Sequence, residues 1–105
     1  MTLQQLGVDR ERLADFCRRW KIQEIALFGS ALRDDFGPES DIDLLVTFSP
    51  DASWGLLERV RLEDELRELF HREVDLVEKP VIEQSRNWLK RREILDRAET
   101  IYDAR

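Results

Sequence analysis

Two aspartates, Asp41 and Asp43, stand just before an apolar run, and ten residues separate them from a Gly-Ser pair, Gly29-Ser30. On a strand, residues two apart leave the same face, with their Cα atoms about 7 Å apart. Two carboxylates held side by side repel each other unless a cation lies between them. Carboxylates, water and nucleotide phosphates are the ligands that Mg²⁺ prefers. The spacing therefore predicts a metal site that receives a phosphate.

The Gly-Ser pair supplies the phosphate-binding half of this prediction. Gly29 follows a predicted strand and lets the backbone approach a ligand, while Ser30 opens a short helix whose free N–H groups favour anions. Arg33 lies one helical turn further on and could neutralise phosphate charge. Taken alone, a Gly-Ser pair is more often a turn with a helix cap, and Arg33 could equally pair with Asp34 or Asp35 at the surface.

Asp75 is the third candidate acid, because it lies within another apolar stretch. If its strand lies beside that of Asp41 and Asp43, the three carboxylates could hold two ions about 3.5–4 Å apart. Asp75 would then act as a ligand or as a general base. A salt-bridge role for Asp75 and a solvated strand end for Asp41 and Asp43 remain the plain alternatives. A calcium loop is disfavoured because it needs a further oxygen ligand and then a glycine, where Leu45 and Val46 stand.

Alternating hydrophobic periodicities predict the elements that position these residues. The order is αβαβαβα, so we expect an α/β (α+β) fold with a small mixed sheet flanked by helices. The predicted strands are residues 22–28, 41–48 and 73–77. The predicted helices are one capped by Asp9 and running to Trp20, a short one over residues 30–35, one capped by Ser53 and running to Phe70, and one from Pro80 to about Arg97.

Apolar residues at helical spacing predict which side chains are buried. In the first, third and last helices they are Leu13, Phe16, Cys17 and Trp20; Leu56, Leu57, Val60, Leu66, Leu69 and Phe70; and Trp88, Leu89 and Leu95. The lone His71 has no second His or Cys nearby, so we expect it to be structural. Trp54, in a loop beside Gly55, is the aromatic residue we expect to contact a partner.

Composition limits the class of protein. The chain of 105 residues suits one domain over residues 1–105, and its net charge of −6 disfavours nonspecific binding to DNA or RNA. The single Cys17 excludes an internal disulfide, and the sequence shows neither a signal peptide nor a long apolar run. We therefore expect a cytoplasmic protein without direct DNA binding or membrane association.

The two motifs together resemble the signature of a known family. Residues 27–33 and residues 40–46, which carry Gly29-Ser30 and Asp41-Ile42-Asp43, are similar to the minimal nucleotidyltransferases. These form the smallest branch of the DNA polymerase beta-like nucleotidyltransferase superfamily. The similarity covers about residues 22–78, including the strand of Asp75, and a looser likeness extends to Ile101-Tyr102.

This resemblance implies an activity, cofactors and a partner. The activity is transfer of AMP from ATP with two Mg²⁺ ions, with Asp41, Asp43 and Asp75 as catalytic metal ligands and Gly29, Ser30 and Arg33 as nucleotide-binding residues. Members of this size resemble the antitoxin half of a toxin–antitoxin pair. Their partner is a HEPN-domain ribonuclease toxin, which they inactivate by adding AMP to a tyrosine.

Two other functions stay open at this point. One is an antitoxin that inhibits its ribonuclease by binding alone, with an idle nucleotide site. The other is a transferase acting on a small molecule such as an aminoglycoside. The sequence has no room for the helical domain with which larger relatives grip such acceptors, so a protein acceptor is favoured.

Overall fold

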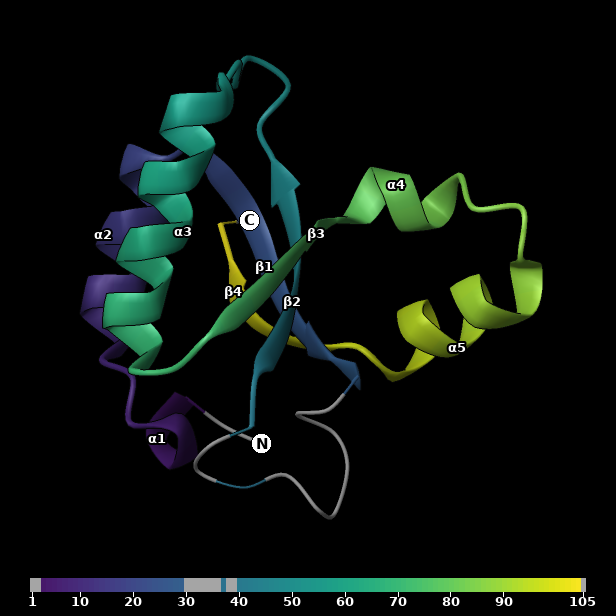
Figure 1. Cartoon of the computed structure of the whole chain (residues 1–105), viewed down its shortest axis with the longest axis horizontal. Helices are drawn as coiled ribbons and strands as arrows, with labels where there is room; N and C mark the ends of the chain where they lie inside the picture. Colours follow the sequence, from purple (N-terminus) through teal and green to yellow (C-terminus); the bar gives the residue numbers. More distant parts are fainter. Residues whose placement is uncertain (1–2, 30–36, 38–39, 105) are drawn as a thin grey trace.

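Four strands form one mixed sheet at the centre of the molecule, in the order β3-β2-β1-β4 (Figure 1). The computed structural model describes residues 3–29, 37 and 40–104. Strand β1 pairs antiparallel with both β2 and β4, whereas β2 and β3 run parallel. The strands are β1 (Ile22–Phe28), β2 (Ile42–Phe48), β3 (Val74–Glu78) and β4 (Glu99–Asp103).

The helices divide between the two sides of this sheet (Figure 1). Helices α2 and α3 cover one face, with the short α1 below them, and α4 and α5 lie on the other side. Across the part of the chain that the structure describes, no helix is long and apolar enough to cross a membrane. The helices are α1 (Leu3–Leu6), α2 (Arg10–Arg19), α3 (Leu56–Phe70), α4 (Lys79–Glu83) and α5 (Trp88–Arg97).

The hydrophobic core lies between the sheet and the pair α2 and α3. Alternate residues of each strand point to the same face, so the even-numbered residues of β2 and β3 fill this core. The core residues from these elements are Leu13, Phe16 and Cys17 of α2, Leu62, Leu66, Leu69 and Phe70 of α3, Ile22, Ile25 and Leu27 of β1, Ile42, Leu44 and Val46 of β2, and Val74 of β3. The odd-numbered residues of β2 and β3 are left for the opposite face, which we call the open face.

Several sequence predictions are confirmed at the level of single elements. Helix α2 begins after Asp9, whose carboxylate accepts a hydrogen bond of 2.9 Å from the Glu11 N–H. This bond satisfies one of the donors that a helix start leaves unpaired. Strand β1 has the predicted bounds, and the mixed sheet flanked by helices is the predicted fold class.

Other predictions about elements are wrong. The last predicted helix is two helices, α4 and α5, and the strand β4 was not predicted at all, so the order αβαβαβα lacks one strand. The N-cap of α3 is Gly55, not Ser53. The short helix predicted over residues 30–35 lies outside the described residues.

Some apolar side chains predicted to be buried are exposed. They lie in the first five residues of α3 and the first two of α5, at ends of these helices that extend away from the sheet (Figure 1). These side chains are Leu56, Leu57, Val60, Trp88 and Leu89, with exposed fractions of 49–81%. Trp54, which we expected to contact a partner, is half-buried: its indole N–H donates to the Trp20 carbonyl at 3.0 Å and its ring meets that of Trp20 edge-on. Its contact with a partner stays a prediction.

The buried Cys17 predicts how stability depends on pH. Burial raises the pKa of its thiol from 9.0 to about 12, while the Arg18 guanidinium lowers it. The folded chain therefore holds this proton more tightly than the unfolded chain, and the corresponding stability is complete below pH 9 and lost as pH rises toward 12. We expect urea unfolding free energies of the wild type to fall more between pH 8 and pH 10.5 than those of Cys17→Ala. Equal falls in the two proteins would contradict this assignment.

Candidate active site

Asp43 and Asp75 lie side by side on the open face of the sheet. They are Cα partners in the parallel pairing of β2 with β3, and adjacent strands lie about 4.8 Å apart. Both residues occupy odd positions between core residues, Asp43 between Ile42 and Leu44. Asp43 is partly buried and Asp75 is exposed. Strand pairing thus brings together two of the three acids that the sequence analysis selected.

Asp41 stands one residue before β2, not within a strand as predicted, and its side chain is exposed. The backbone beside it is fixed, because the Ile42 N–H donates to the Glu73 carbonyl at 3.0 Å. Over residues 3–29, 37 and 40–104, no three His, Cys, Asp or Glu side chains are already grouped as metal ligands. The preformed part of the site is therefore the neighbouring pair Asp43 and Asp75.

Gly29 closes against Asp43 from the neighbouring strand. Phe28 is the Cα partner of Asp43, and Gly29 follows it with a φ of +62°, in the left-handed region. A Cβ at Gly29 would overlap the Asp43 carboxylate, with the Asp43 Cγ at 3.2 Å. Glycine therefore suits this position through its backbone conformation, and its lack of a side chain leaves the Asp43 carboxylate in place. The two motifs, far apart in sequence, meet at this contact, while the predicted phosphate ligands Ser30 and Arg33 lie outside the described residues.

Arg72 is a positioning residue that the sequence analysis missed. One Nη of its guanidinium donates to the carbonyls of Gly37, at 3.1 Å, and Ser40, at 3.2 Å. It follows His71, which ends α3 in the left-handed conformation, with φ +57°. Arg72 thereby connects the end of α3 to Gly37 and Ser40, which precede Asp41 in the chain. No sequence signal marked it, because an arginine after a helix end is usually a surface cation.

We expect Arg72→Gln to lower the rate of the site's reaction about tenfold, because even a small shift of the Asp41 segment misaligns the reacting groups. The measurement is a comparison of kcat with KM for the nucleotide, and kcat should carry most of the loss. Arg61→Gln, an exposed arginine on α3, is the matched control. An Arg72→Gln enzyme with unchanged kcat would show that this tie does not position the acids.

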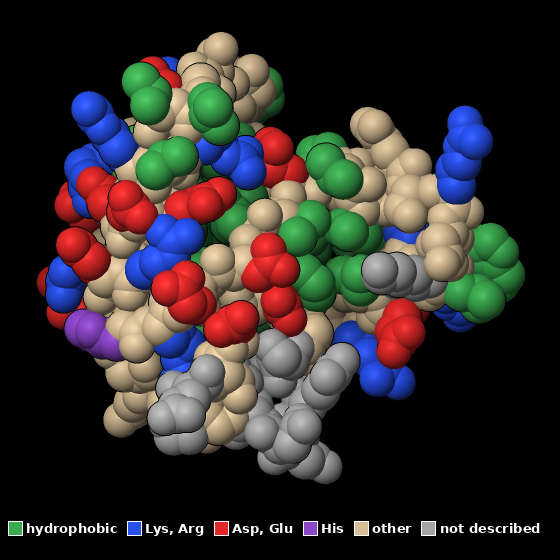
Figure 2. Space-filling view, viewed as in Figure 1, with side chains coloured by type: hydrophobic (Ala, Val, Ile, Leu, Met, Phe, Trp, Pro, Cys, Tyr) green, Lys and Arg blue, Asp and Glu red, His purple; other side chains and the backbone are tan. Residues whose placement is uncertain are grey.

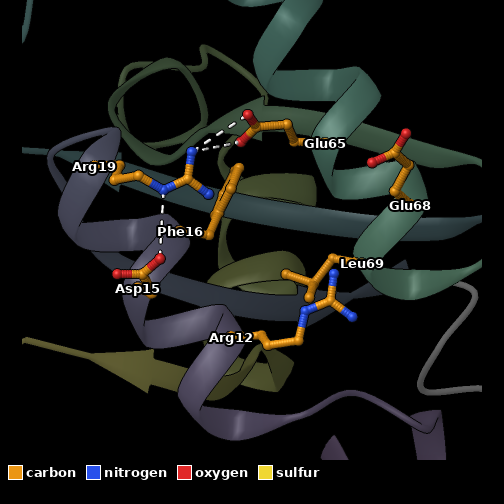
Figure 3. Close-up of a pocket in the computed structure, with 7 residues that line it drawn as sticks. All are labelled: Arg12, Asp15, Phe16, Arg19, Glu65, Glu68 and Leu69. Carbon is orange, nitrogen blue, oxygen red and sulfur yellow. Dashed lines mark hydrogen bonds and ion pairs between the residues drawn. The ribbon is translucent and has the colours of Figure 1, made fainter.

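A charged cavity of about 200 Å³ lies on the other side of the sheet, between α2 and α3 (Figure 3). Its charged side chains largely pair with one another: Arg19 contacts Glu65 at 3.3 Å and Asp15 at 3.5 Å. The Trp20 indole N–H also donates to Glu65, at 2.7 Å. The sheet separates this cavity from Asp43 and Asp75, so we assign it to the packing of the two helices.

Comparison with known proteins agrees with this geometry. The model of the family described as "Nucleotidyltransferase domain" matches residues 10–101. The protein adenylyltransferase MntA of Thermococcus cleftensis is 41% identical over 61 residues, which cover 58% of this chain and 60% of that protein. The matched regions span between 60% and 69% of the length of the first four curated relatives.

Solved structures share the fold. A protein described as a minimal nucleotidyltransferase has a TM-score of 0.66 and 31% identity, covering 97% of this chain and 96% of its own. An antitoxin complex with the tri-AMPylated HEPN toxin of Shewanella oneidensis has a TM-score of 0.56 and 22% identity, covering 96% of this chain and 73% of that one. With Asp43 and Asp75 in register and Gly29 packed against Asp43, this chain belongs to the nucleotidyltransferase domain family.

Proposed function

We propose that this protein is an Mg²⁺-dependent antitoxin that transfers AMP from ATP to a tyrosine hydroxyl of a HEPN ribonuclease and so inactivates it. The observation that carries the proposal is the in-register pair Asp43 and Asp75 on the open face, with Gly29 packed against Asp43. Family membership supplies the class of reaction. The protein acceptor comes from relatives named as protein adenylyltransferases and from the AMPylated HEPN toxin complex.

The three acids suit magnesium by their chemistry. This ion takes one or two carboxylates, keeps several waters and binds the phosphates of its nucleotide. Asp43 and Asp75 would hold it from adjacent strands, and Asp41 would add a third carboxylate from the start of β2. When bound, the ion neutralises the negative charge that builds up on the phosphates during transfer.

The remaining steps are the attack of the acceptor on ATP and the departure of pyrophosphate. The tyrosine oxygen forms a bond to the α-phosphorus, the bond from that phosphorus to the bridging oxygen breaks, and pyrophosphate leaves. Asp75 is exposed on β3, an edge strand, so an acceptor can approach it from outside the sheet and give its proton to that carboxylate. Gly29 allows the triphosphate close to the backbone, and Ser30 and Arg33 would complete its binding site.

The test is intact mass spectrometry of a HEPN ribonuclease, offered as the acceptor, after incubation with this chain, ATP and Mg²⁺. We expect mass gains in whole AMP units and loss of ribonuclease activity, both absent without Mg²⁺. No gain with the ribonuclease still inhibited would mean inhibition by binding alone. The exposed apolar side chains at the starts of α3 and α5, among them Leu56 and Trp88, are the surface that favours this second candidate.

A further inference from the structure

A cavity of about 290 Å³ lies on the open face, between the sheet and α5. Its floor comes from three strands, with Ala26 of β1, Leu45 of β2 and Thr100 of β4, and its opposite wall comes from Leu95 and Ala98. Hydrophobic side chains gather between the acidic side chains in the middle of the molecule and the segment of α4 and α5 (Figure 2). This cavity has no role in the site described so far.

The cavity lies next to the acidic pair along strand β2. Leu45 is two residues from Asp43 on the same strand face, and it is the Cα partner of Ala26 on β1. This spacing places Leu45 about 7 Å from Asp43 at Cα. In a nucleotide, one ribose separates the α-phosphate from the base. A base must therefore lie at a short distance from the carboxylates, and the cavity is at that distance along the open face.

The walls of the cavity suit a flat, largely apolar group. Ala26 and Leu45 on the floor are 3% and 2% exposed, and the alanines Ala26 and Ala98 leave space that larger side chains would fill. Small-molecule sites are mostly apolar, carry a few polar groups and have volumes of about 300–1,000 Å³. The cavity volume of about 290 Å³ lies just below that range, so it suits one nucleoside and not a folded protein segment.

The polar groups lie at the end of the cavity where α4 begins. Lys79 Nζ donates to Glu24 Oε1 at 3.0 Å, and the Glu24 side chain is only 12% exposed. An ammonium carries three N–H donors. Among the described residues, Glu24 is the one acceptor that contacts Lys79. Every nucleobase has a ring nitrogen or carbonyl acceptor on its edge, which suits the other donors of Lys79.

We propose that this cavity is the nucleoside subsite, in which the base of the substrate nucleotide lies between the sheet and α5 with Lys79 donating to its edge. The inference rests on the proposed function, which places the α-phosphate beside Asp43. Recognition of the base is then separate from recognition of the phosphates, since the two use different parts of the open face.

The first test is Ala98→Phe, which fills the cavity, compared with Ala104→Phe, an exposed position outside it. Calorimetric titration with Mg²⁺ and either ATP or inorganic tripolyphosphate separates base from phosphate binding. We expect Ala98→Phe to weaken ATP binding at least about tenfold and leave tripolyphosphate binding unchanged. Ala104→Phe should bind both as the wild type does. Unchanged ATP affinity in Ala98→Phe, with AMP transfer intact, would overturn the subsite and leave the proposed function standing.

The second test needs no substitution, so it does not depend on the folding of a variant. The wild-type chain is irradiated with 8-azido-ATP and Mg²⁺, and the labelled peptide is identified by mass spectrometry. We expect the label within residues 95–100 or at Lys79, and competition by ATP but not by tripolyphosphate. A label on α2 or α3 would overturn the subsite. A wild type that binds neither nucleotide nor tripolyphosphate would overturn the proposed function as well.

Discussion

Replacing Asp43 by Asn is expected to lower AMP transfer by about 10³-fold or more while leaving the fold intact. Asp43 is the acid that contacts Gly29 and pairs with Asp75, so both halves of the site lose their shared carboxylate. The amide keeps the size of the side chain and removes its charge. Intact-mass assays of the acceptor protein over time give the rate, and thermal unfolding gives the stability.

The stability result is as informative as the rate. Like charges directly opposite on paired strands are destabilising by a few tenths of a kcal/mol. Removing one of them should therefore leave the melting temperature equal to or above that of the wild type. Asp51→Asn, at an exposed carboxylate that pairs with Lys21 at 3.2 Å, is the matched control and should keep full activity. A clearly lower melting temperature in Asp43→Asn would mean that the Asp43 carboxylate stabilises the fold, and the loss of activity could then not be assigned to catalysis alone.

Replacing Gly29 by Ala should remove most activity, by about 10²-fold, and also destabilise the chain. A non-glycine residue in the left-handed region costs roughly 1 kcal/mol. The new Cβ would in addition overlap the Asp43 carboxylate and displace it from Asp75. The displacement affects the reaction because misplacement by about 1 Å costs about 10²-fold in rate.

Gly7 provides the control that separates these two effects. It also has a positive φ, +73°, but a Cβ there would find open space. Gly7→Ala should therefore lose only the backbone contribution, roughly 1 kcal/mol, with activity unchanged. The measurements are urea unfolding and the rate of AMP transfer for both variants. Full activity in Gly29→Ala would show that the contact with Asp43 does not set the position of the carboxylate.

Part of the fold could be predicted because hydrophobic periodicity reports on burial. Strand β1 and the cap at Asp9 agree with the prediction, since each depends on local residues. Strand β4 could not be found in this way, because it is a short edge strand with only Ile101 and Tyr102 partly buried. The break between α4 and α5 contains neither glycine nor proline, and its local signal is weaker: Ser85 and Asn87 are residue types that favour a helix N-cap.

In the candidate site, too, the sequence predicted some contacts and missed others. The sequence predicted that Asp43 and Asp75 lie together only if their strands are neighbours. The sheet order shows that β2 and β3 are neighbours. The tie from Arg72 to Gly37 and Ser40 joins residues more than 30 positions apart, which no local pattern reveals. Contacts of this kind depend on tertiary packing, so they emerge only from the structure.

Because β2 and β3 pair in parallel register, Asp43 and Asp75 lie on the same face only if both occupy odd-numbered positions or both occupy even-numbered ones. Asp43 and Asp75 share a face because each occupies an odd position in a strand whose even positions are buried under α2 and α3. Inserting one residue into β3 before Asp75 would turn that carboxylate into the core, whereas inserting two would restore its face. In this chain, the face of Asp75 is therefore kept by insertions within β3 only in steps of two, whereas insertions in the loop before β3 do not change it.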